Sequence, residues 1–256
     1  MTDAQLVALD PSPFCDCKRG RSEEHWTRKR VEEDRRAWAE TERLNAARRA
    51  ARRNKLFVDA AIPDRFRGIT LESFRQKFGG DKKQVLDAAT ELRDTGKIKK
   101  SKGPDGRDRG YYYGLWLWGD YGIGKTSILS GVFTPLMERL GGGLWLPYLS
   151  FLDQVRNGLN DGTATTLKQA AMLTPVLMFE DLGSMGRDME TTYTQEVLWQ
   201  IIYHRNANNL LTLVSSNLSR MAIVEHFGSF GDGFFQRVAE FMNILEVKGR
   251  VIRDTV

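Results

Sequence analysis

The chain of 256 residues is poor in cysteine and has no long hydrophobic run. Its two cysteines, Cys15 and Cys17, cannot build the disulfide framework of a small secreted protein. No apolar stretch approaches the ~20 residues that a membrane-spanning helix needs. The first residues also lack the basic and apolar regions of a secretory signal. We therefore expect a cytoplasmic protein.

Acidic residues are in the minority, and the positive excess is unevenly placed. The chain carries 38 Lys and Arg against 33 Asp and Glu, a net charge of +5. Residues 18–55 alone hold fourteen Lys and Arg against seven Asp and Glu, and residues 97–109 hold six against two. Basic segments indicate an anionic partner, nucleic acid first. For residues 28–55, a solvated helix face is an equally open interpretation.

A short apolar run, Leu115–Trp118, leads into the pattern G-x-x-x-x-G-K-T at residues 119–126. The run predicts a buried strand, and the glycines allow a tight turn whose N–H groups converge on phosphate oxygens. Lys125 would reach the β- and γ-phosphates, and the Thr126 hydroxyl would ligate Mg²⁺. A helix beginning near Lys125 would add its positive N-terminal dipole. The residues predicted to bind ATP or GTP here are Gly119, Asp120, Tyr121, Gly122, Ile123, Gly124, Lys125, Thr126 and Ser127.

Around this motif, apolar strands alternate with helices, which predicts an α/β domain with a parallel sheet. The predicted strands are 113–118, 143–148, 175–180, 210–215 and 243–248. The predicted helices are 125–139, 149–158, 192–207 and a weaker one at 219–227. A chain of this length holds one such domain and an accessory segment.

The residues before the sheet have a different character. Residues 1–22 predict a loosely ordered start, and residues 22–55, which contain neither Gly nor Pro, predict one long exposed helix or two consecutive ones. Helix-breaking residues mark a boundary at 61–74. A helix at about 81–93 and a polar linker at 97–109 follow.

Four polar residues after the phosphate loop predict the rest of a hydrolytic site. Glu180 and Asp181 follow an apolar strand, at the edge where an open α/β sheet binds ligands. Glu180 would hold Mg²⁺, and Asp181 would polarise the attacking water. Asn217 ends the next strand and would contact a γ-phosphate or water. Arg237 would neutralise phosphoryl charge from a neighbouring subunit, whereas most isolated arginines are surface residues.

Together these motifs resemble the AAA+ ATPases of the DnaC/DnaI helicase-loader and IstB group. The segment IPDRFRGITLESF is similar to the I-P-x-R-[FY]-R-x-x-T-[LF]-x-N-F stretch that precedes the ATPase core of that group. Other segments resemble its second-helix segment, its L-x-x-I-I-x-x-R helix and its closing G-x-S-Y-R element; they are 149–156, 197–205 and 245–253. The resemblance covers the chain from about residue 57 to the end.

The resemblance implies a P-loop NTPase core of the AAA+ type at 57–256, with a five-stranded parallel sheet and no C-terminal lid. A helical, basic extension at 1–56 would precede it. Glu180 and Asp181 become the Walker B pair, Asn217 the sensor 1 residue and Arg237 the arginine finger. The implied cofactors are ATP and Mg²⁺. From the C-terminal tail, Arg253, ahead of Arg250, would contact the nucleotide.

The chain departs from the group in three places. Glu180 stands where the group usually has Asp, which puts the efficiency of hydrolysis in question. Val251 and Ile252 replace the Ser-Tyr of the closing motif. Many loaders carry a zinc-binding cysteine cluster, but this chain offers only Cys15, Cys17 and His25, fewer than the four ligands of structural zinc. We therefore expect a metal-free start.

The resemblance favours an ATP-dependent loader of a replicative DNA helicase, encoded by a bacterium or phage. ATP would assemble subunits into a ring or spiral, the N-terminal segment would grip the helicase, and basic residues would hold single-stranded DNA. The alternative is an IstB-like ATPase that regulates a transposase on duplex DNA. A small-molecule kinase and a nucleotide-switched adaptor that hydrolyses ATP poorly are further alternatives.

Overall fold

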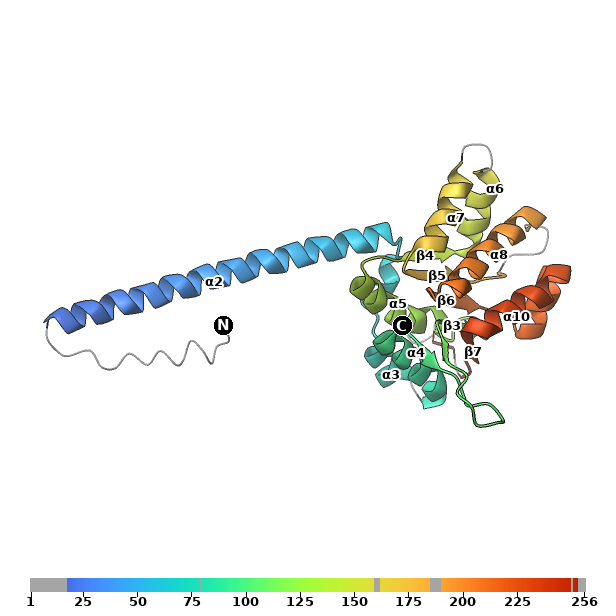
Figure 1. Ribbon diagram of the computed structural model, residues 1–256, viewed down its shortest axis with the longest axis horizontal. Helices are drawn as coiled ribbons and strands as arrows, with labels where there is room; N and C mark the ends of the chain where they lie inside the picture. The colour runs from blue at the N-terminus through green and yellow to red at the C-terminus, as the bar shows by residue number, and fades with distance from the viewer. Residues whose placement is uncertain (1–17, 79, 159–161, 185–189, 250, 253–256) are drawn as a thin grey trace. The chain divides into compact units, whose positions relative to one another are not determined.

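The computed structural model describes residues 18–78, 80–158, 162–184, 190–249 and 251–252. The chain divides into two compact units, residues 1–54 and residues 55–256 (Figure 1). Among the described residues, no helix is long and apolar enough to cross a membrane.

One helix dominates the N-terminal part: α2 (Lys18–Asp59), of 42 residues. Of the two predicted arrangements, the single long helix is the observed one. The predicted start at Ser22 is wrong because the helix already runs through Gly20; a glycine inside a helix costs only about 1 kcal/mol. Trp38 and Leu44 are 53% and 55% exposed on it. These two apolar side chains are therefore open to a partner.

A parallel five-stranded sheet forms the centre of the second unit, with strand order β4-β5-β6-β3-β7. All five predicted strands are confirmed, and their ends shift by at most two residues. They are β3 (Gly114–Trp118), β4 (Leu144–Pro147), β5 (Val176–Glu180), β6 (Leu211–Ser216) and β7 (Met242–Glu246). The central strands β5 and β6 are buried along their whole length, as expected for a sheet covered on both faces.

Helices cover both faces of this sheet (Figure 1). Leu115 and Leu117 of β3 pack with α3 (Leu71–Phe78), α4 (Lys83–Thr95) and α5 (Lys125–Leu140). Trp116, between them, faces the opposite core. The helices on that side are α6 (Tyr148–Asn157), α7 (Thr163–Leu173), α8 (Thr192–Ala207), α9 (Arg220–Phe227) and α10 (Gly231–Phe241).

Arg205 gives a physical reason for the motif L-x-x-I-I-x-x-R, which residues 197–205 match. This side chain is completely buried and donates hydrogen bonds to the Thr212 hydroxyl and to main-chain oxygens of Ala171, Thr174 and Leu211. Burial lowers the pKa of its guanidinium to about 9. The arginine thereby ties the end of α7 and the start of β6 to α8.

Three helices and one hairpin were not predicted. The helix α3 lies in the segment interpreted as a boundary, and α7 and α10 follow glycine-rich starts that weaken a sequence-based helix prediction. Residues 97–109, interpreted as a linker, are part of an antiparallel hairpin of β1 (Ile98–Lys99) and β2 (Tyr111–Tyr112). Two short 3-10 turns, η1 (Asp64–Phe66) and η2 (Gly80–Lys82), flank α3, and η4 (Gly228–Phe230) precedes α10. The described residues after β7 contain no helix.

Candidate nucleotide-binding site

The strand register brings the predicted site residues to one edge of the sheet. Trp118, the last residue of β3, pairs with Ser216, the last residue of β6. Phe179 of β5 pairs with Val214, so Glu180 lies beside Ser215. Because all these strands are parallel, the segments that follow them emerge at the same carboxyl edge. The phosphate loop, the two acids and Asn217 therefore meet there, as predicted.

Two glycines of the loop occupy space that no other residue could enter. Gly119 has φ +142°, and a Cβ there would lie 2.5 Å from the main-chain oxygen of Val247. Gly124 has φ +94°, and a Cβ there would lie 2.7 Å from both Phe74 and Ile252. The left-handed backbone and the close approach both require glycine. The loop is thus pressed between the last strand, α3 and the C-terminal segment.

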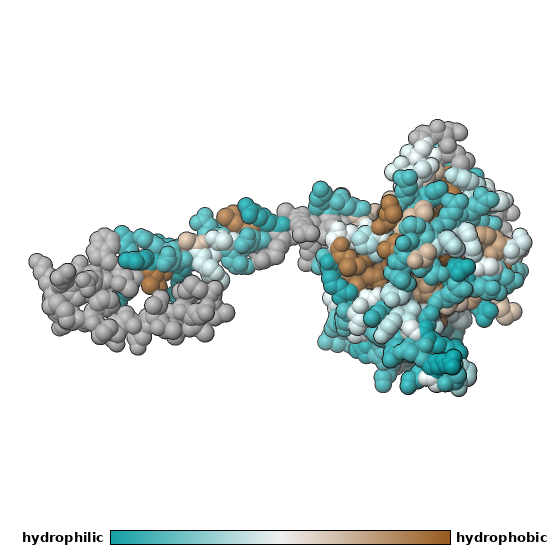
Figure 2. Space-filling view, viewed as in Figure 1, coloured by the Kyte–Doolittle hydropathy of each residue, from teal (hydrophilic) through white to brown (hydrophobic). Residues whose placement is uncertain are grey.

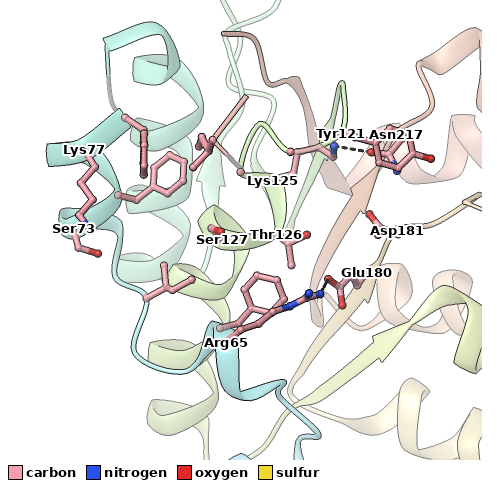
Figure 3. Close-up of a pocket in the computed structure, with 17 residues that line it drawn as sticks. Arg65, Ser73, Lys77, Tyr121, Lys125, Thr126, Ser127, Glu180, Asp181 and Asn217 are labelled. Carbon is pink, nitrogen blue, oxygen red and sulfur yellow. Dashed lines mark hydrogen bonds and ion pairs between the residues drawn. The ribbon is translucent and has the colours of Figure 1, made fainter. Parts of the chain in front are cut away.

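Lys125 links the phosphate loop to the end of β6. It is the first residue of α5 and only 5% exposed. Its ammonium donates hydrogen bonds to the main-chain oxygens of Gly119 (2.8 Å) and Asp120 (2.7 Å) and to Asn217 Oδ1 (2.8 Å). Figure 3 shows Lys125 and Asn217 facing each other at the cavity wall. A buried cation held in this way is preorganised to receive an anion.

Glu180 is nearly buried, 8% exposed, beside a hydroxyl and an indole. Its Oε2 accepts a hydrogen bond from Trp145 Nε1 at 2.9 Å, and the nearby Thr126 side chain favours the charged form of the carboxyl. Arg65 Nη2 lies 4.0 Å from Oε1 (Figure 3). Burial raises the pKa of this carboxyl, and the negative charge of Asp181 adds to the rise. The two oxygen ligands predicted for Mg²⁺, from Thr126 and Glu180, therefore lie together.

Asp181 has an unusual backbone conformation, and Asn217 has a buried nitrogen without a hydrogen-bond partner among the described residues. Asp181 has φ +55°, the left-handed region, and its N–H donates to the Ser215 hydroxyl at 3.0 Å. Non-glycine residues in this region store strain and cluster at functional sites. The Asn217 Nδ2 is buried without a hydrogen-bond partner among the described residues. An amide donor of this kind, in the wall of the site, suits a phosphate or water oxygen.

These residues line a cavity of about 560 Å³, within the usual size range of small-molecule sites. One wall is polar and is made of the predicted residues. The rest of the lining is mainly apolar and was not predicted as part of the site; it includes Phe66, Ile69, Phe74, Phe78 and Ile252, with the polar Arg65, Ser73 and Lys77. The Ile252 N–H donates to the Gly122 carbonyl at 2.8 Å, which fixes the tail against the loop. In the sequence, the Ile62–Phe74 motif was the signal that could have indicated this wall. The motif alone does not say which of its residues line the cavity.

Several predicted residues do not reach this cavity. Gly119, Asp120 and Ile123 line a separate hollow on the β7 side of the loop. Arg237 lies on α10, where its Nη1 donates to Glu240 Oε2 at 2.6 Å, and it is absent from the cavity lining. Arg253 lies outside the described residues, as do Cys15, Cys17 and the side chain of His25.

Replacing Glu180 by glutamine should raise the melting temperature of the ligand-free protein at neutral pH. A carboxyl whose pKa is higher in the folded protein than in the unfolded chain binds more protons in the folded state. Its contribution to stability is therefore full below the unfolded pKa and is lost as pH rises through the folded pKa. Glutamine carries no charge to desolvate, so the difference should shrink in acid. Thermal melts across pH test this, with the exposed Glu196→Gln as control. A lower melting temperature at neutral pH would contradict it.

The sheet order, phosphate loop and cavity define the class of protein: the chain has the AAA+ P-loop NTPase fold. It aligns with the crystal structure of the DnaC helicase loader at a TM-score of 0.57 and 19% identity, over 73% of this chain and 100% of that one. For the crystal structure of DnaI the TM-score is 0.57 at 21% identity, over 74% and 93%. The replication initiator DnaA bound to AMPPCP and single-stranded DNA gives 0.55 at 15% identity, over 72% and 51%.

In sequence, the chain is similar to the replicative helicase loader DnaI of Bacillus subtilis (strain 168), with 32% identity over 114 residues. The match spans 44% of this chain but only 36% of that relative. No family model matches the chain. The predicted resemblance to the DnaC/DnaI helicase loaders is confirmed by these matches.

Proposed function

We propose that this protein is an ATP-dependent loader of a replicative DNA helicase. The observation that carries the proposal is the sequence match to the loader DnaI. The cavity at the carboxyl edge of the AAA+ sheet supports it. The proposal comprises ATP hydrolysis with Mg²⁺, assembly of several subunits, binding to a hexameric helicase and contact with single-stranded DNA. It also implies a cytoplasmic protein.

In this proposal the cavity binds ATP with its base and its phosphates at opposite walls. The apolar wall with Phe66, Phe74 and Ile252 suits a flat, apolar base. Lys125 and the N–H groups at the start of α5 suit the phosphates. Thr126 and Glu180, which both line the cavity, suit Mg²⁺. Held by these two side chains, Mg²⁺ would supply positive charge that offsets the charge of the phosphates.

The remaining polar residues would serve hydrolysis. Asp181, held at φ +55° beside the Ser215 hydroxyl, would accept a proton from the attacking water. The Asn217 Nδ2, which has no partner among the described residues, would orient that water or hold the γ-phosphate. Arg65, 70% exposed and 4.0 Å from Glu180, is a further cation at the open side of the cavity, where it would offset phosphate charge.

Arg237 would complete the site of a neighbouring subunit. Its side chain, 36% exposed on α10, is held by Glu240 and by the ring of Tyr203, with its guanidinium carbon 5.5 Å from the ring centroid. The Nε is buried without a partner among the described residues. This rigid mounting, away from the chain's own cavity, suits a cation that acts between subunits.

Arg237→Ala should preserve ATP binding and lower hydrolysis. An arginine supplied in trans is worth about 10³–10⁵ in turnover in the best-studied cases, so a fall by at least tenfold is expected. The decisive sample mixes the Arg237→Ala and Lys125→Ala variants. An Arg237→Ala subunit keeps its own cavity, and a neighbouring Lys125→Ala subunit still supplies Arg237 to it. Hydrolysis should therefore partly return in the mixture. The exposed Arg220→Ala serves as control. Wild-type turnover by Arg237→Ala at every protein concentration would contradict the role in trans.

The helix α2 would supply the surface for the helicase, within the predicted partner-binding segment 1–56. Trp38 and Leu44 expose apolar side chains along it, and its many charged residues favour contact with water over the rest of its surface. Complex formation tests this step. Size-exclusion chromatography of the full-length protein with its host's hexameric helicase should give a joint peak. A Trp38→Ser/Leu44→Ser variant should lose it, and separate elution of the wild type would contradict the proposal.

The IstB-like alternative stays a prediction. It would be favoured over the loader by stable filaments on duplex DNA and by stimulation of a transposase. Phosphorylation of a metabolite would favour a kinase. ATP-dependent assembly with almost no hydrolysis would favour the adaptor, for which the Glu180 departure is the reason.

A further inference from the structure

A basic hairpin, residues 97–113, takes no part in the nucleotide site. Its second strand leads directly into Gly114, the first residue of β3, whereas the phosphate loop follows the last residue of that strand. The hairpin therefore lies at the amino end of the sheet, about 17 Å from the cavity edge at ~3.3 Å per residue. It is the green hairpin that projects from the second unit in Figure 1.

The hairpin tip is folded, not a loose linker. Lys100 N donates to the Gly110 carbonyl at 3.0 Å, and Gly103 N donates to the Arg107 carbonyl at 2.9 Å. Both aspartates of the tip serve the loop itself: Asp105 Oδ1 accepts from the Arg107 N–H, and Asp108 Oδ1 accepts from the Gly110 N–H. This order fixes the positions of the cations before any ligand binds, which lowers the entropy cost of binding.

Six Lys and Arg stand against two Asp between residues 97 and 109, and the surface at this end of the unit is strongly hydrophilic (Figure 2). Lys99 and Arg107 pair with the two aspartates at 3.6 and 3.5 Å. Lys102 and Arg109 are exposed and form no ion pair within the described part of the chain. The guanidinium of Arg109 packs over Gly103, where a Cβ would approach its Nε to 2.9 Å. The tip thus presents oriented cations with too few acids to neutralise them.

Two adjacent tyrosines pack against lysines at the base of the hairpin. Lys97 Nζ lies 4.0 Å from the ring centroid of Tyr111, and Lys100 Nζ lies 4.8 Å from that of Tyr112. Tyr111 is 37% exposed. A solvated loop needs no aromatic side chains at its surface, whereas a chain of phosphates and unpaired bases is bound by cations for the phosphates and rings for the bases.

We infer that the hairpin 97–113 binds the backbone of single-stranded DNA, with Lys102 and Arg109 on phosphates and Tyr111 against a base. The inference rests on the proposed function for the choice of DNA as partner. Single strands fit better than duplex because only unpaired bases expose a face to a tyrosine ring. The hairpin and the nucleotide site are separate, so DNA binding here can be removed without touching ATP binding.

The test is binding of the full-length protein to fluorescein-labelled oligothymidine, measured by anisotropy over a range of salt concentrations. For Lys102→Ala/Arg109→Ala, the slope of log affinity against log salt should fall by about 1.4, or ~0.7 for each phosphate contact on a single strand. Tyr111→Leu should weaken binding by at least about fivefold with an unchanged slope, since stacking contributes about 1–3 kcal/mol per base. Affinity for Mg·AMPPCP should stay at the wild-type value in both.

The matched control, Arg75→Ala/Lys83→Ala, removes two exposed cations that lie outside the hairpin, on α3 and α4. Lys83 begins α4 and lies about 18 Å along the helix from the residue before the hairpin. The control should keep the wild-type slope. An unchanged slope in Lys102→Ala/Arg109→Ala would overturn the inference. The proposed function would still stand if the protein binds the helicase. Equal losses on duplex would overturn the assignment to single strands. A wild-type protein that binds no oligonucleotide would also overturn it.

Discussion

Lys125→Ala should weaken ATP binding by about 10- to 100-fold, because a charge-assisted hydrogen bond contributes about 1.5–3 kcal/mol. The ammonium is buried and is already aligned by Gly119, Asp120 and Asn217. Its removal leaves those three oxygens facing an anion with no cation between them. Isothermal titration with Mg·AMPPCP measures the loss without hydrolysis.

Lys83→Ala is the matched control, since this lysine is exposed and lies outside the cavity lining. It should bind the analogue with wild-type affinity. Lys125→Ala should keep a wild-type circular dichroism spectrum, which separates loss of binding from loss of folding. Unchanged affinity in Lys125→Ala would show that the phosphates lie elsewhere, and the assignment of the whole polar wall would fail with it.

Asp181→Asn should lower ATP turnover by about 10²–10⁴-fold, the usual contribution of a general base, while Mg·ATP still binds. Asparagine is the right substitution because it tolerates the left-handed backbone at least as well as aspartate. The φ of +55° at this position would make alanine strain the loop and confuse the result. Steady-state phosphate release with a parallel binding titration measures both quantities.

The companion variant is Glu180→Gln, which should affect the metal and not the water. Its turnover should recover in part at high Mg²⁺, whereas that of Asp181→Asn should not. If Asp181→Asn hydrolysed ATP at the wild-type rate, the base would be another residue. If both wild type and variant hydrolysed ATP very slowly, the switched adaptor would become the better reading.

The hydrophobic pattern was sufficient to predict the sheet, because strands buried on both faces form continuous apolar runs such as 176–179. Motif spacing was sufficient to predict the polar wall, since parallel strands end at one edge. The meeting of Lys125, Asn217 and Asp181 follows from those two facts. Side-chain pairing within that wall, such as Trp145 on Glu180, depends on three-dimensional packing and has no local signal.

The apolar wall could not be predicted for a similar reason. Phe66 and Phe74 come from a segment whose Pro and Gly indicate a boundary, and Phe78 ends α3, which has only eight residues. Ile252 joins them from the other end of the chain. Short helices are stabilised by what they pack against and not by their own propensity. The hairpin 97–113 was hidden likewise, because its strands have two residues each.

The departure at Glu180 has a structural counterpart. Glutamate has one methylene more than the aspartate usual in the group, and here its carboxylate is hydrogen-bonded to Trp145 Nε1 at 2.9 Å. The indole fixes the longer side chain and positions its other oxygen near Thr126 and Arg65. We therefore expect Trp145 to act as a positioning residue for the metal site.

The most direct test of the central claim is deposition of the host's hexameric helicase on circular single-stranded DNA, read out as unwinding of an annealed oligonucleotide. A closed circle has no end to thread, so a hexamer enters it only when opened. The account predicts that the full-length protein with ATP increases unwinding and that Lys125→Ala does not. Equal unwinding with and without the protein, in the presence of a demonstrated ATP complex, would contradict the account.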